Sequence, residues 1–420
     1  MNIYEPAEDS RMLAEAVNRH AFGKVIDIGT GSGIQAAAAI KSKKVTKITA
    51  TDIDKNCKKN VKNISGRIKF ICSDLFENIP KQKFDMSETQ SVSESQKPSV
   101  SDDARKLKLP THAQNRRGGF DTIIFNPPYL PQDKGIKDAT IYGGKKGYEI
   151  IERFLSNCSS YLSKKGIILL VFSSLSKKNR IDELIEDNCL KKEELERKEL
   201  PFVEMLYVYK IRKSPLLLNL EQKRIFNIKK FAEGHRGIIY AGKLGSRKVA
   251  IKARRKDSAA KGNIANEAKW LKILNRHNIG PRLISSGRDY FIYEFVEGRF
   301  IMDFINSCSS KRMVAAVIKN VFQQCRMLDK LKVNKGEMLR PYKHIIIDKK
   351  PVMVDFERCK KTRKPKNITQ FCQFLVSGNV RGLLKAKGIA INKEAILSAA
   401  KSYKKAQNTA NFNKISAMIK

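Results

Sequence analysis

Residues 122–129 read Thr-Ile-Ile-Phe-Asn-Pro-Pro-Tyr, an apolar run that ends in an Asn-Pro-Pro-Tyr tetrad. Residues of the β-branched and aromatic types favour a strand, and a proline cannot donate a hydrogen bond to a neighbouring strand. The strand must therefore leave its sheet at Pro127 and Pro128. We expect the tetrad at the rim of a sheet.

The tetrad offers the groups that recognise a planar NH2 group. Asn126 has a side-chain carbonyl acceptor, the backbone of Pro127 has a second, and Tyr129 supplies a flat face. Two acceptors on the hydrogens of an amide or an adenine amine restore lone-pair character to its nitrogen. We therefore take Asn126, Pro127, Pro128 and Tyr129 as candidate catalytic residues. An ordinary Pro-Pro turn is the alternative.

Upstream, an expected strand at residues 24–28 leads into a glycine turn, and an alanine-rich helix follows at 34–41. Glycines at 29, 31 and 33 allow the backbone to approach a nucleotide-like ligand closely. The same turn also matches the form G-x-G-x-x-A used for dinucleotides. From this turn alone, a site for NAD therefore stays open.

Two acidic residues follow the next two expected strands. Asp52 follows residues 47–51, about twenty residues past the glycines, where a carboxylate can accept both ribose hydroxyls. Asp74 follows the strand at 68–72 and precedes the apolar pair Leu75-Phe76, where an adenine ring could lie. Together with the glycine turn, these residues predict an adenosine site on a doubly wound α/β sheet.

Residues 4 to about 212 resemble the class I S-adenosylmethionine methyltransferases of the HemK type. These enzymes methylate the side-chain amide nitrogen (N5) of glutamine in peptide-chain release factors. The resemblance is closest to the short archaeal and eukaryotic forms. It is carried by Tyr4-Glu5-Pro6-Ala7-Glu8-Asp9, Asp27 to Gly33, Asp52, Asp74, Asn126 to Pro131, and the glycine-rich segment Tyr142 to Glu149.

The resemblance implies a Rossmann-like methyltransferase domain at 1–213, with S-adenosylmethionine as its cofactor. It also implies a release factor as protein substrate and a small zinc-binding activator as partner. An adenine-N6 methyltransferase acting on DNA or RNA would use the same tetrad chemistry and remains the alternative. The implied cofactor-binding residues are Glu5, Asp9, Asp27, Gly29, Gly31, Gly33, Asp52, Asp74 and Asn126.

One segment departs from this pattern. Residues 86–119 are rich in Ser, Gln, Lys and Asp and show no periodicity. A long polar insertion of this kind is expected to be a mobile loop.

The second half, 215–420, begins after a break at Lys213-Ser214-Pro215. Lys252 ends an expected strand and Glu267 lies on the next helix, so the two can form an ion pair that presents an ammonium group to phosphate oxygens. Asp355 follows a later strand. Residues 225–376 resemble the protein-kinase-like fold, most closely the compact archaeal RIO-like atypical Ser/Thr kinases.

By that resemblance the second half is an α+β domain that binds ATP through Lys252 and Glu267 and Mg²⁺ through Asp355. Glu337 stands where the catalytic aspartate is expected, and Lys343 or His344 where a metal-binding asparagine is expected. An atypical kinase, an ATP-binding pseudokinase and a recruitment module all stay open. A helical tail at 377–420 is expected to dock on its own domain through an apolar stripe.

The chain has a formal net charge of +41, with 83 Lys and Arg against 42 Asp and Glu. Such a charge favours encounter with polyanions such as ribosomal or transfer RNA, although a Lys-rich composition alone would produce it. The eight cysteines form no CxxC pair, which predicts buried thiols in a reducing compartment. The sequence has neither a membrane-spanning apolar run nor a signal peptide, so we expect a cytoplasmic protein without membrane contact.

Overall fold

The computed structural model describes residues 5–80, 119–133, 135, 138, 140–234, 237–255 and 263–419. The chain divides into two compact units, residues 1–230 and 231–420. The predicted mobile insertion at 86–119 lies outside the described residues, apart from Gly119. Along the described parts of the chain, no helix combines the length and the apolar character needed to cross a membrane.

The first unit is built on a seven-stranded sheet with the order β3-β2-β1-β4-β5-β7-β6. Strands β1 to β5 pair in parallel, and β7 runs antiparallel to both of its neighbours. The strand order reverses between β1 and β4, where open α/β sheets place their ligands. The strands are β1 (Gly23–Ile28), β2 (Val45–Asp52), β3 (Lys69–Cys72), β4 (Phe120–Phe125), β5 (Leu162–Ser173), β6 (Leu190–Leu200) and β7 (Glu204–Lys213).

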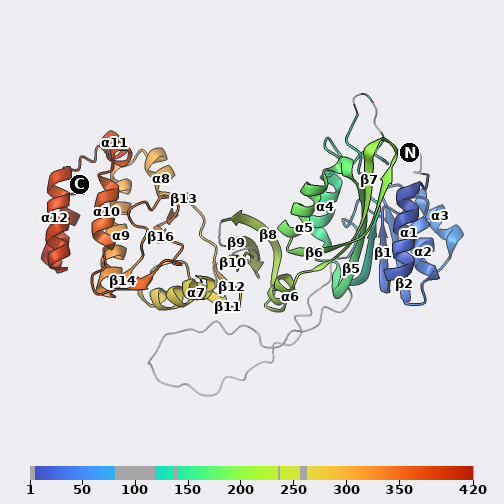
Figure 1. Ribbon diagram of the computed structural model, residues 1–420, viewed down its shortest axis with the longest axis horizontal. Coiled ribbons are helices and arrows are strands. Elements are labelled where there is room, and N and C mark those ends of the chain that lie inside the picture. Colours follow the sequence, from blue (N-terminus) through green and yellow to red (C-terminus); the bar gives the residue numbers. More distant parts are fainter. Residues whose placement is uncertain are drawn as a thin grey trace, which may run out of the picture. The chain divides into compact units, whose positions relative to one another are not determined.

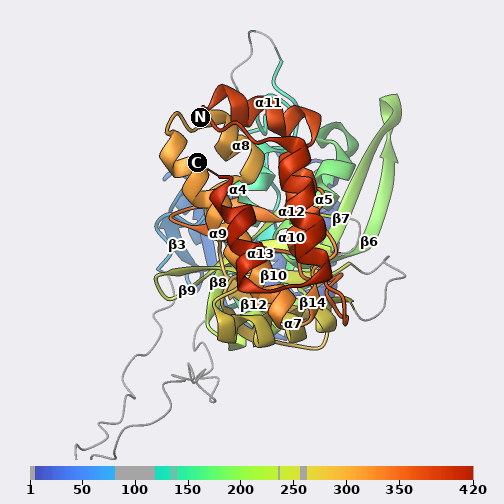
Figure 2. The ribbon, with the colours of Figure 1, turned by 90° about the vertical axis from the view of Figure 1, so that its left-hand side faces the viewer.

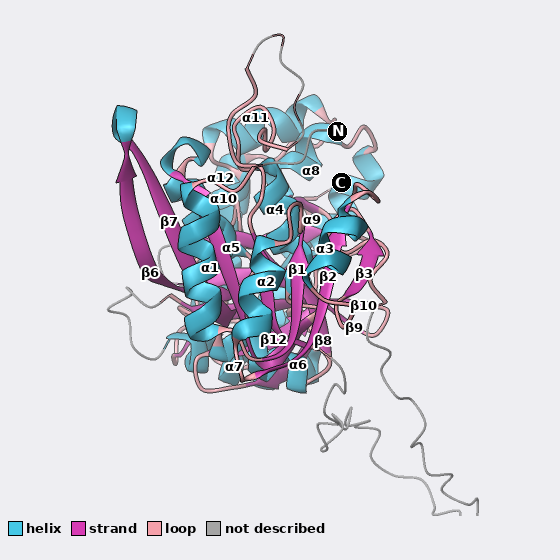
Figure 3. Ribbon diagram, turned by 90° about the vertical axis from the view of Figure 1, so that its right-hand side faces the viewer, coloured by secondary structure: helices cyan, strands magenta, loops and turns pink. Residues whose placement is uncertain are grey.

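Helices cover both faces of this sheet, as expected for a doubly wound fold (Figures 1 and 3). Helices α1 (Glu8–His20) and α2 (Ile34–Lys41) lie on one face, and α4 (Glu149–Cys158) and α5 (Lys178–Asp187) lie on the other. The remaining helical elements of the unit are α3 (Cys57–Ile64), α6 (Pro215–Gln222), η1 (Ser174–Ser176) and η2 (Pro201–Val203). The α/β prediction for this half is confirmed.

The core of the first unit explains why the tetrad strand is central. Ile123, Ile124 and Phe125 of β4 are at most 2% exposed, and the Phe125 ring packs 4.4 Å from that of Phe154 on α4. Such a strand is buried on both faces, as parallel strands of doubly wound sheets are. Burial holds the strand end, and therefore Asn126, in one place.

Three expectations about the first unit need correction. The sequence of residues 149–162 predicts a single helix, but α4 ends at Cys158 and β5 begins at Leu162. Strand β6 occupies residues 190–200, for which the sequence predicted no element; with β7 it forms a long hairpin (Figure 2). No disulfide joins any of the eight cysteines, but Cys72 is exposed and Cys308 is half-buried rather than buried.

A five-stranded sheet in the order β11-β12-β10-β9-β8 follows in the chain, and its edge strand β8 includes the boundary between the two units at residues 230 and 231. Its strands are β8 (Ile225–Glu233), β9 (Gly237–Leu244), β10 (Arg247–Arg254), β11 (Leu283–Ser286) and β12 (Tyr290–Glu294). Strand β10 pairs antiparallel with β9 and β12. Helix α7 (Asn263–Leu274) packs against this sheet and is followed by η3 (Asn275–His277). The sequence of residues 232–241 predicts a single strand, which is wrong, because β8 ends at Glu233 and β9 starts at Gly237.

The rest of the second unit is mainly helical, with α10, α12 and α13 visible in Figure 2. The expected apolar stripe of the tail is confirmed, because Ile391, Ile396 and Ala399 belong to the core of this unit. The helices are α8 (Ile301–Ser307), α9 (Lys311–Lys330), α10 (Asn367–Leu375), α11 (Gly378–Ala386), α12 (Lys393–Lys405) and α13 (Thr409–Ala417). The short strands are β13 (Arg299–Phe300), β14 (Val333–Asn334), β15 (Ile345–Ile347), β16 (Pro351–Met353) and β17 (Lys360–Lys361).

Candidate functional site

A cavity of about 300 Å³ opens at the carboxyl ends of β1, β2 and β4. The predicted site residues that line it are Asp9, Gly29, Gly31, Asp52, Asp74, Asn126, Pro127, Pro128 and Tyr129. The other three predicted cofactor residues, Glu5, Asp27 and Gly33, are not among its lining residues. Sequence and structure therefore place most of the predicted methyltransferase site in one cavity.

The glycine turn between β1 and α2 forms one wall of the cavity. Gly29 and Gly31 have φ angles of 66° and 50°, the left-handed region in which a side chain would be strained. Beneath the turn, Asp27 is 1% exposed and accepts a 2.6 Å hydrogen bond from the Thr30 hydroxyl. Burial raises the pKa of Asp27 to about 7. Asp27 thus shapes the turn from below.

Asp52, the last residue of β2, and Asp74, which follows β3, are both anchored. Asp52 accepts the backbone N–H of Gly31 on Oδ2 and that of Asp54 on Oδ1, each at 2.9 Å. Asp74 Oδ2 lies 2.8 Å from a guanidinium nitrogen of Arg153, a residue of α4 that also lines the cavity. Arg153 was not among the predicted site residues, and it fixes the orientation of the Asp74 carboxylate.

The amide of Asn126 is held in one orientation. Its Nδ2 donates to the hydroxyl of Ser10 at 3.1 Å, while its Oδ1 is buried and has no hydrogen-bond partner among the described residues. Ser10 is 1% exposed, and its backbone carbonyl accepts from Gln35 Nε2 at 3.0 Å. Buried acceptors nearly always have a partner, so a partnerless one on a cavity wall points to a missing donor. Ser10 and Gln35 were not predicted.

Tyr129 is fixed at both ends. Its hydroxyl donates to Asp9 Oδ2 at 3.1 Å, and its backbone carbonyl accepts from the Ser176 hydroxyl at 2.6 Å. A Cβ atom at Gly147 would lie 2.4 Å from that same carbonyl, so the segment at 142–149 can approach the tetrad only because it carries glycine there. The glycine-rich segment therefore packs directly on the tetrad backbone.

The cavity wall fits S-adenosylmethionine. Its glycine turn admits close backbone approach, Asp52 offers a carboxylate of the kind that accepts ribose hydroxyls, and Ile53 and Leu75 offer an apolar surface of the kind that contacts an adenine ring. The tetrad adds an acceptor for an NH2 group next to this surface. The arrangement can hold a nucleoside-like methyl donor and an amide or amine acceptor side by side.

The second unit gathers a separate cluster of charged residues. Lys252 Nζ lies 2.6 Å from Glu267 Oε2 and 3.0 Å from Asp355 Oδ1, so the predicted ion pair is confirmed. The second oxygen of Glu267 accepts the backbone N–H of Phe356 at 3.1 Å. Burial acts to lower the pKa of Lys252, but the two carboxylates outweigh it and raise that pKa.

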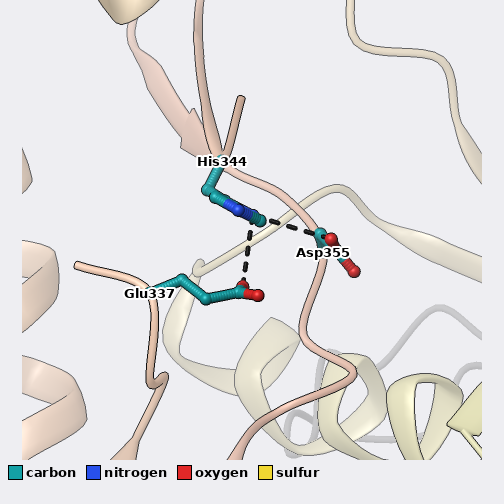
Figure 4. A group of neighbouring side chains, drawn as sticks. All are labelled: Glu337, His344 and Asp355. Atoms are coloured by element: carbon teal, nitrogen blue, oxygen red, sulfur yellow. Dashed lines mark ion pairs between the residues drawn. The ribbon is translucent and has the colours of Figure 1, made fainter. Parts of the chain in front are cut away.

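Glu337 and His344 lie beside Asp355 (Figure 4). The Nδ1 atom of His344 is 3.2 Å from Glu337 Oε2 and 3.6 Å from Asp355 Oδ2. Burial, together with the charge of Lys335, lowers the pKa of His344 to about 4. Lys335, which the sequence analysis did not single out, has a fully buried side chain and donates to the backbone carbonyl of Asp355 at 2.8 Å.

Comparisons with known proteins add the following. Residues 6–87 match the family model "Methyltransferase small domain". The "Putative protein N5-glutamine methyltransferase" of Methanocaldococcus jannaschii is 30% identical over 215 residues, which cover 49% of this chain and 90% of that protein. "Methyltransferase HEMK2" of Homo sapiens is 25% identical over 195 residues, covering 44% of this chain and 77% of that protein.

Among solved structures, the E. cuniculi Mtq2–Trm112 complex, responsible for methylation of the eRF1 translation termination factor, matches with a TM-score of 0.36 and 21% identity. The match covers 51% of this chain and all of that chain. The kinase-like resemblance of residues 225–376 stays a prediction.

Proposed function

We propose, because this chain belongs to the family of HemK-like protein N5-glutamine methyltransferases, that its first unit methylates the side-chain amide nitrogen of a glutamine in a peptide-chain release factor. The observation that carries the proposal is the buried Oδ1 atom of Asn126, which has no partner in the described structure and belongs to a cavity-lining residue. A glutamine amide supplies the N–H donor that this atom lacks.

The residues of the cavity divide the task. The glycine turn, Asp52 and Asp74 would hold S-adenosylmethionine, which would supply an electrophilic methyl group when bound. Asn126 Oδ1 and the carbonyl of Pro127 accept the two hydrogens of the substrate NH2 group, which turns its lone pair toward the methyl group. Tyr129 stacks on the plane of the amide. The nitrogen becomes acidic as it gains the methyl group, so its proton can then leave without a strong base.

Mass spectrometry with methyl-deuterated S-adenosylmethionine tests this function. The full chain is incubated with the release factor of its host or with host RNA and DNA. We expect deuterated methyl on one glutamine of the release factor. Methylation of adenine and none of glutamine would overturn the proposal and support the nucleic-acid alternative, which the net charge of +41 favours.

The same reactions are run with and without a small zinc-binding activator protein. The family resemblance implies such a partner, so we expect its addition to raise the rate of glutamine methylation. An unchanged rate would remove the activator from the proposal and leave the methyl acceptor as it stands.

We propose further that the second unit binds a nucleotide through Lys252. The supporting observation is the buried Lys252–Glu267 pair with Asp355 beside it, because this arrangement aims an ammonium group at phosphate oxygens. Lys252→Met should abolish binding of a fluorescent ATP analogue. Lys248→Met, on the same strand but exposed, is the matched control and should bind normally. Equal binding by both variants would contradict the proposal and favour a recruitment module.

A further inference from the structure

Three side chains with metal-ligating atoms converge in the second unit. The nearest such atoms of Glu337, His344 and Asp355 all lie within 4.8 Å of one another. Figure 4 shows His344 paired with both Glu337 and Asp355. Donor atoms that bind one ion at about 2.0–2.2 Å stand roughly 3 Å apart, and His344 Nδ1 lies 3.2 Å from Glu337 Oε2 and 3.6 Å from Asp355 Oδ2. The spacing suits one shared ion.

Asp355 and His344 each keep an atom for that ion, while Glu337 Oε2 would share it with the ammonium of Lys335 at 3.4 Å. Asp355 gives Oδ1 to Lys252, which leaves its Oδ2 facing His344. The Nδ1 atom of His344 is buried without a hydrogen-bond partner in the described structure, although two carboxylates lie close to it. A buried polar atom in this position is accounted for by a missing ion. Asp355 is also held at a φ of 62°, a strained conformation that clusters at ligand sites.

The surrounding charges favour a cation. Three carboxylates, those of Glu267, Glu337 and Asp355, face two buried lysines, Lys252 and Lys335. The two lysines leave one of the three carboxylate charges without a buried cation. The nearest further cation is the guanidinium of Arg358, which is 59% exposed and lies 3.5 Å from Glu337 Oε1. An exposed guanidinium is screened by solvent and neutralises a half-buried carboxylate poorly.

A second cluster of carboxylates in the same region is a weaker candidate for a metal site. Glu267, Asp355 and Glu357 also bring oxygens within 4.8 Å of one another. The ammonium of Lys252, however, lies 2.6 Å from Glu267 and 3.0 Å from Asp355, so it occupies the place that an ion would need. The cluster containing His344 is therefore the metal candidate among the described residues.

The donor set does not fit the Mg²⁺ ion that the kinase resemblance implies. Mg²⁺ prefers an all-oxygen octahedral shell, whereas imidazole nitrogen suits Zn²⁺, Fe²⁺, Co²⁺ and Ni²⁺. We propose that Glu337, His344 and Asp355 bind a divalent transition-metal ion of this kind in preference to Mg²⁺. The proposal depends neither on methyl transfer nor on nucleotide binding, because the three donors are present without either ligand.

Metal titration of the nucleotide-free full chain tests the site. Calorimetry with ZnCl₂ and MgCl₂ should show one ion per chain and binding of Zn²⁺ at least about 100-fold tighter than that of Mg²⁺. His344→Asn, which replaces the nitrogen by an amide oxygen, should weaken Zn²⁺ binding by about 100-fold. His277→Asn, which changes an exposed histidine of η3, should bind as the wild type does.

A second variant keeps the test decisive if His344→Asn does not fold. Glu337→Gln preserves the size of the side chain and removes its charge, and it should weaken Zn²⁺ binding by about 10- to 100-fold. Substitution of Co²⁺ reports the donor type, because thiolate ligands give an intense charge-transfer band that nitrogen and oxygen ligands lack. Equal Zn²⁺ and Mg²⁺ affinities, unchanged binding in both variants, or a thiolate band would each overturn the proposal.

Discussion

Asn126 and Asp355 both follow the end of a strand, but their surroundings differ. Asn126 has one amide atom fixed by the hydroxyl of Ser10 and the other buried without a partner in the described structure. Asp355 is held by the ammonium of Lys252 and stands among further carboxylates. The site at Asn126 offers a hydrogen-bond acceptor to a neutral donor, while the site at Asp355 is held together by ion pairs.

The difference predicts where substitutions will act. Removing a neutral acceptor from an open cavity leaves the fold intact and costs turnover. Removing one member of a buried ion pair leaves an uncompensated charge and costs stability. The four predictions below follow this contrast, from the largest expected effect to the smallest.

Glu267→Ala should destabilise the second unit by about 3–5 kcal/mol, because it leaves the ammonium of Lys252 buried without its nearest partner. Trp270, the only tryptophan of the chain, is 6% exposed in this unit, so its fluorescence reports unfolding in urea. The control Glu297→Ala removes the partner of the exposed Lys248 and should cost less than about 1 kcal/mol. Equal losses of unfolding free energy in the two variants would show that the buried pair contributes no more to stability than the exposed pair.

Asn126→Ala should lower the rate of methyl transfer about 10²- to 10³-fold, close to 3–4 kcal/mol, because it removes the acceptor that grips the substrate NH2 group. Binding of S-adenosylmethionine, measured by calorimetry, should change little. Asn56→Ala alters an exposed asparagine at the start of α3 and is the matched control. A rate near that of the wild type would remove Asn126 from the mechanism.

Asp27→Asn should remove a pH dependence from the stability of the first unit. Burial raises the pKa of this carboxyl from 3.8 to about 7, so the folded state keeps a proton that the unfolded chain has lost. The protonated carboxyl contributes its full stabilisation below pH ~4, and this contribution is lost as the pH rises through 7. The free energy of unfolding therefore falls by about 2–3 kcal/mol between pH 5 and 8. Hydrogen exchange of the β1 amides measures the change. The same slope in wild type and variant would contradict the assignment.

Ser10→Ala should slow methyl transfer by only about five- to tenfold. It deletes the hydroxyl that accepts from Asn126 Nδ2, which is one hydrogen bond worth about 1 kcal/mol. Asn126 keeps its own acceptor but loses its fixed orientation. Steady-state rates on a glutamine peptide measure the effect, and a loss as large as that of Asn126→Ala would give Ser10 a direct role.

The tetrad, the glycine turn and Asp52 could be predicted because each depends on a local pattern. Buried parallel strands can be recognised in a sequence as apolar runs, and their carboxyl ends lie at the same edge of the sheet. That rule brings Asn126 and Asp52 together without any knowledge of contacts. The Lys252–Glu267 pair was predictable for a similar reason, since a strand and the next helix lie side by side.

The partners of these residues could not be predicted, because they come from distant parts of the chain. Ser10 is 116 residues from Asn126, and Arg153 is 79 residues from Asp74. Serines and arginines at such distances carry no spacing that marks them. Only the packing of α1 and α4 against the sheet brings them to the cavity.

Strand β6 was missed for a different reason. Its sequence, Leu-Lys-Lys-Glu-Glu-Leu-Glu-Arg-Lys-Glu-Leu, is mostly charged and lacks the apolar alternation of a half-buried strand. As the edge of the sheet it needs few apolar residues, and charged side chains protect such an edge from pairing with other chains. Ion pairs to β7, such as Glu193 with Lys210, hold it in register.

The central claim is that Asn126 Oδ1 receives the NH2 group of a glutamine side chain. A crystal structure of the full chain with a glutamine peptide and S-adenosylhomocysteine, the demethylated product of the cofactor, tests it directly. The account predicts the glutamine amide nitrogen about 2.7–3.2 Å from Asn126 Oδ1. A glutamine amide bound elsewhere in the cavity, with Asn126 Oδ1 still lacking a donor, would contradict it.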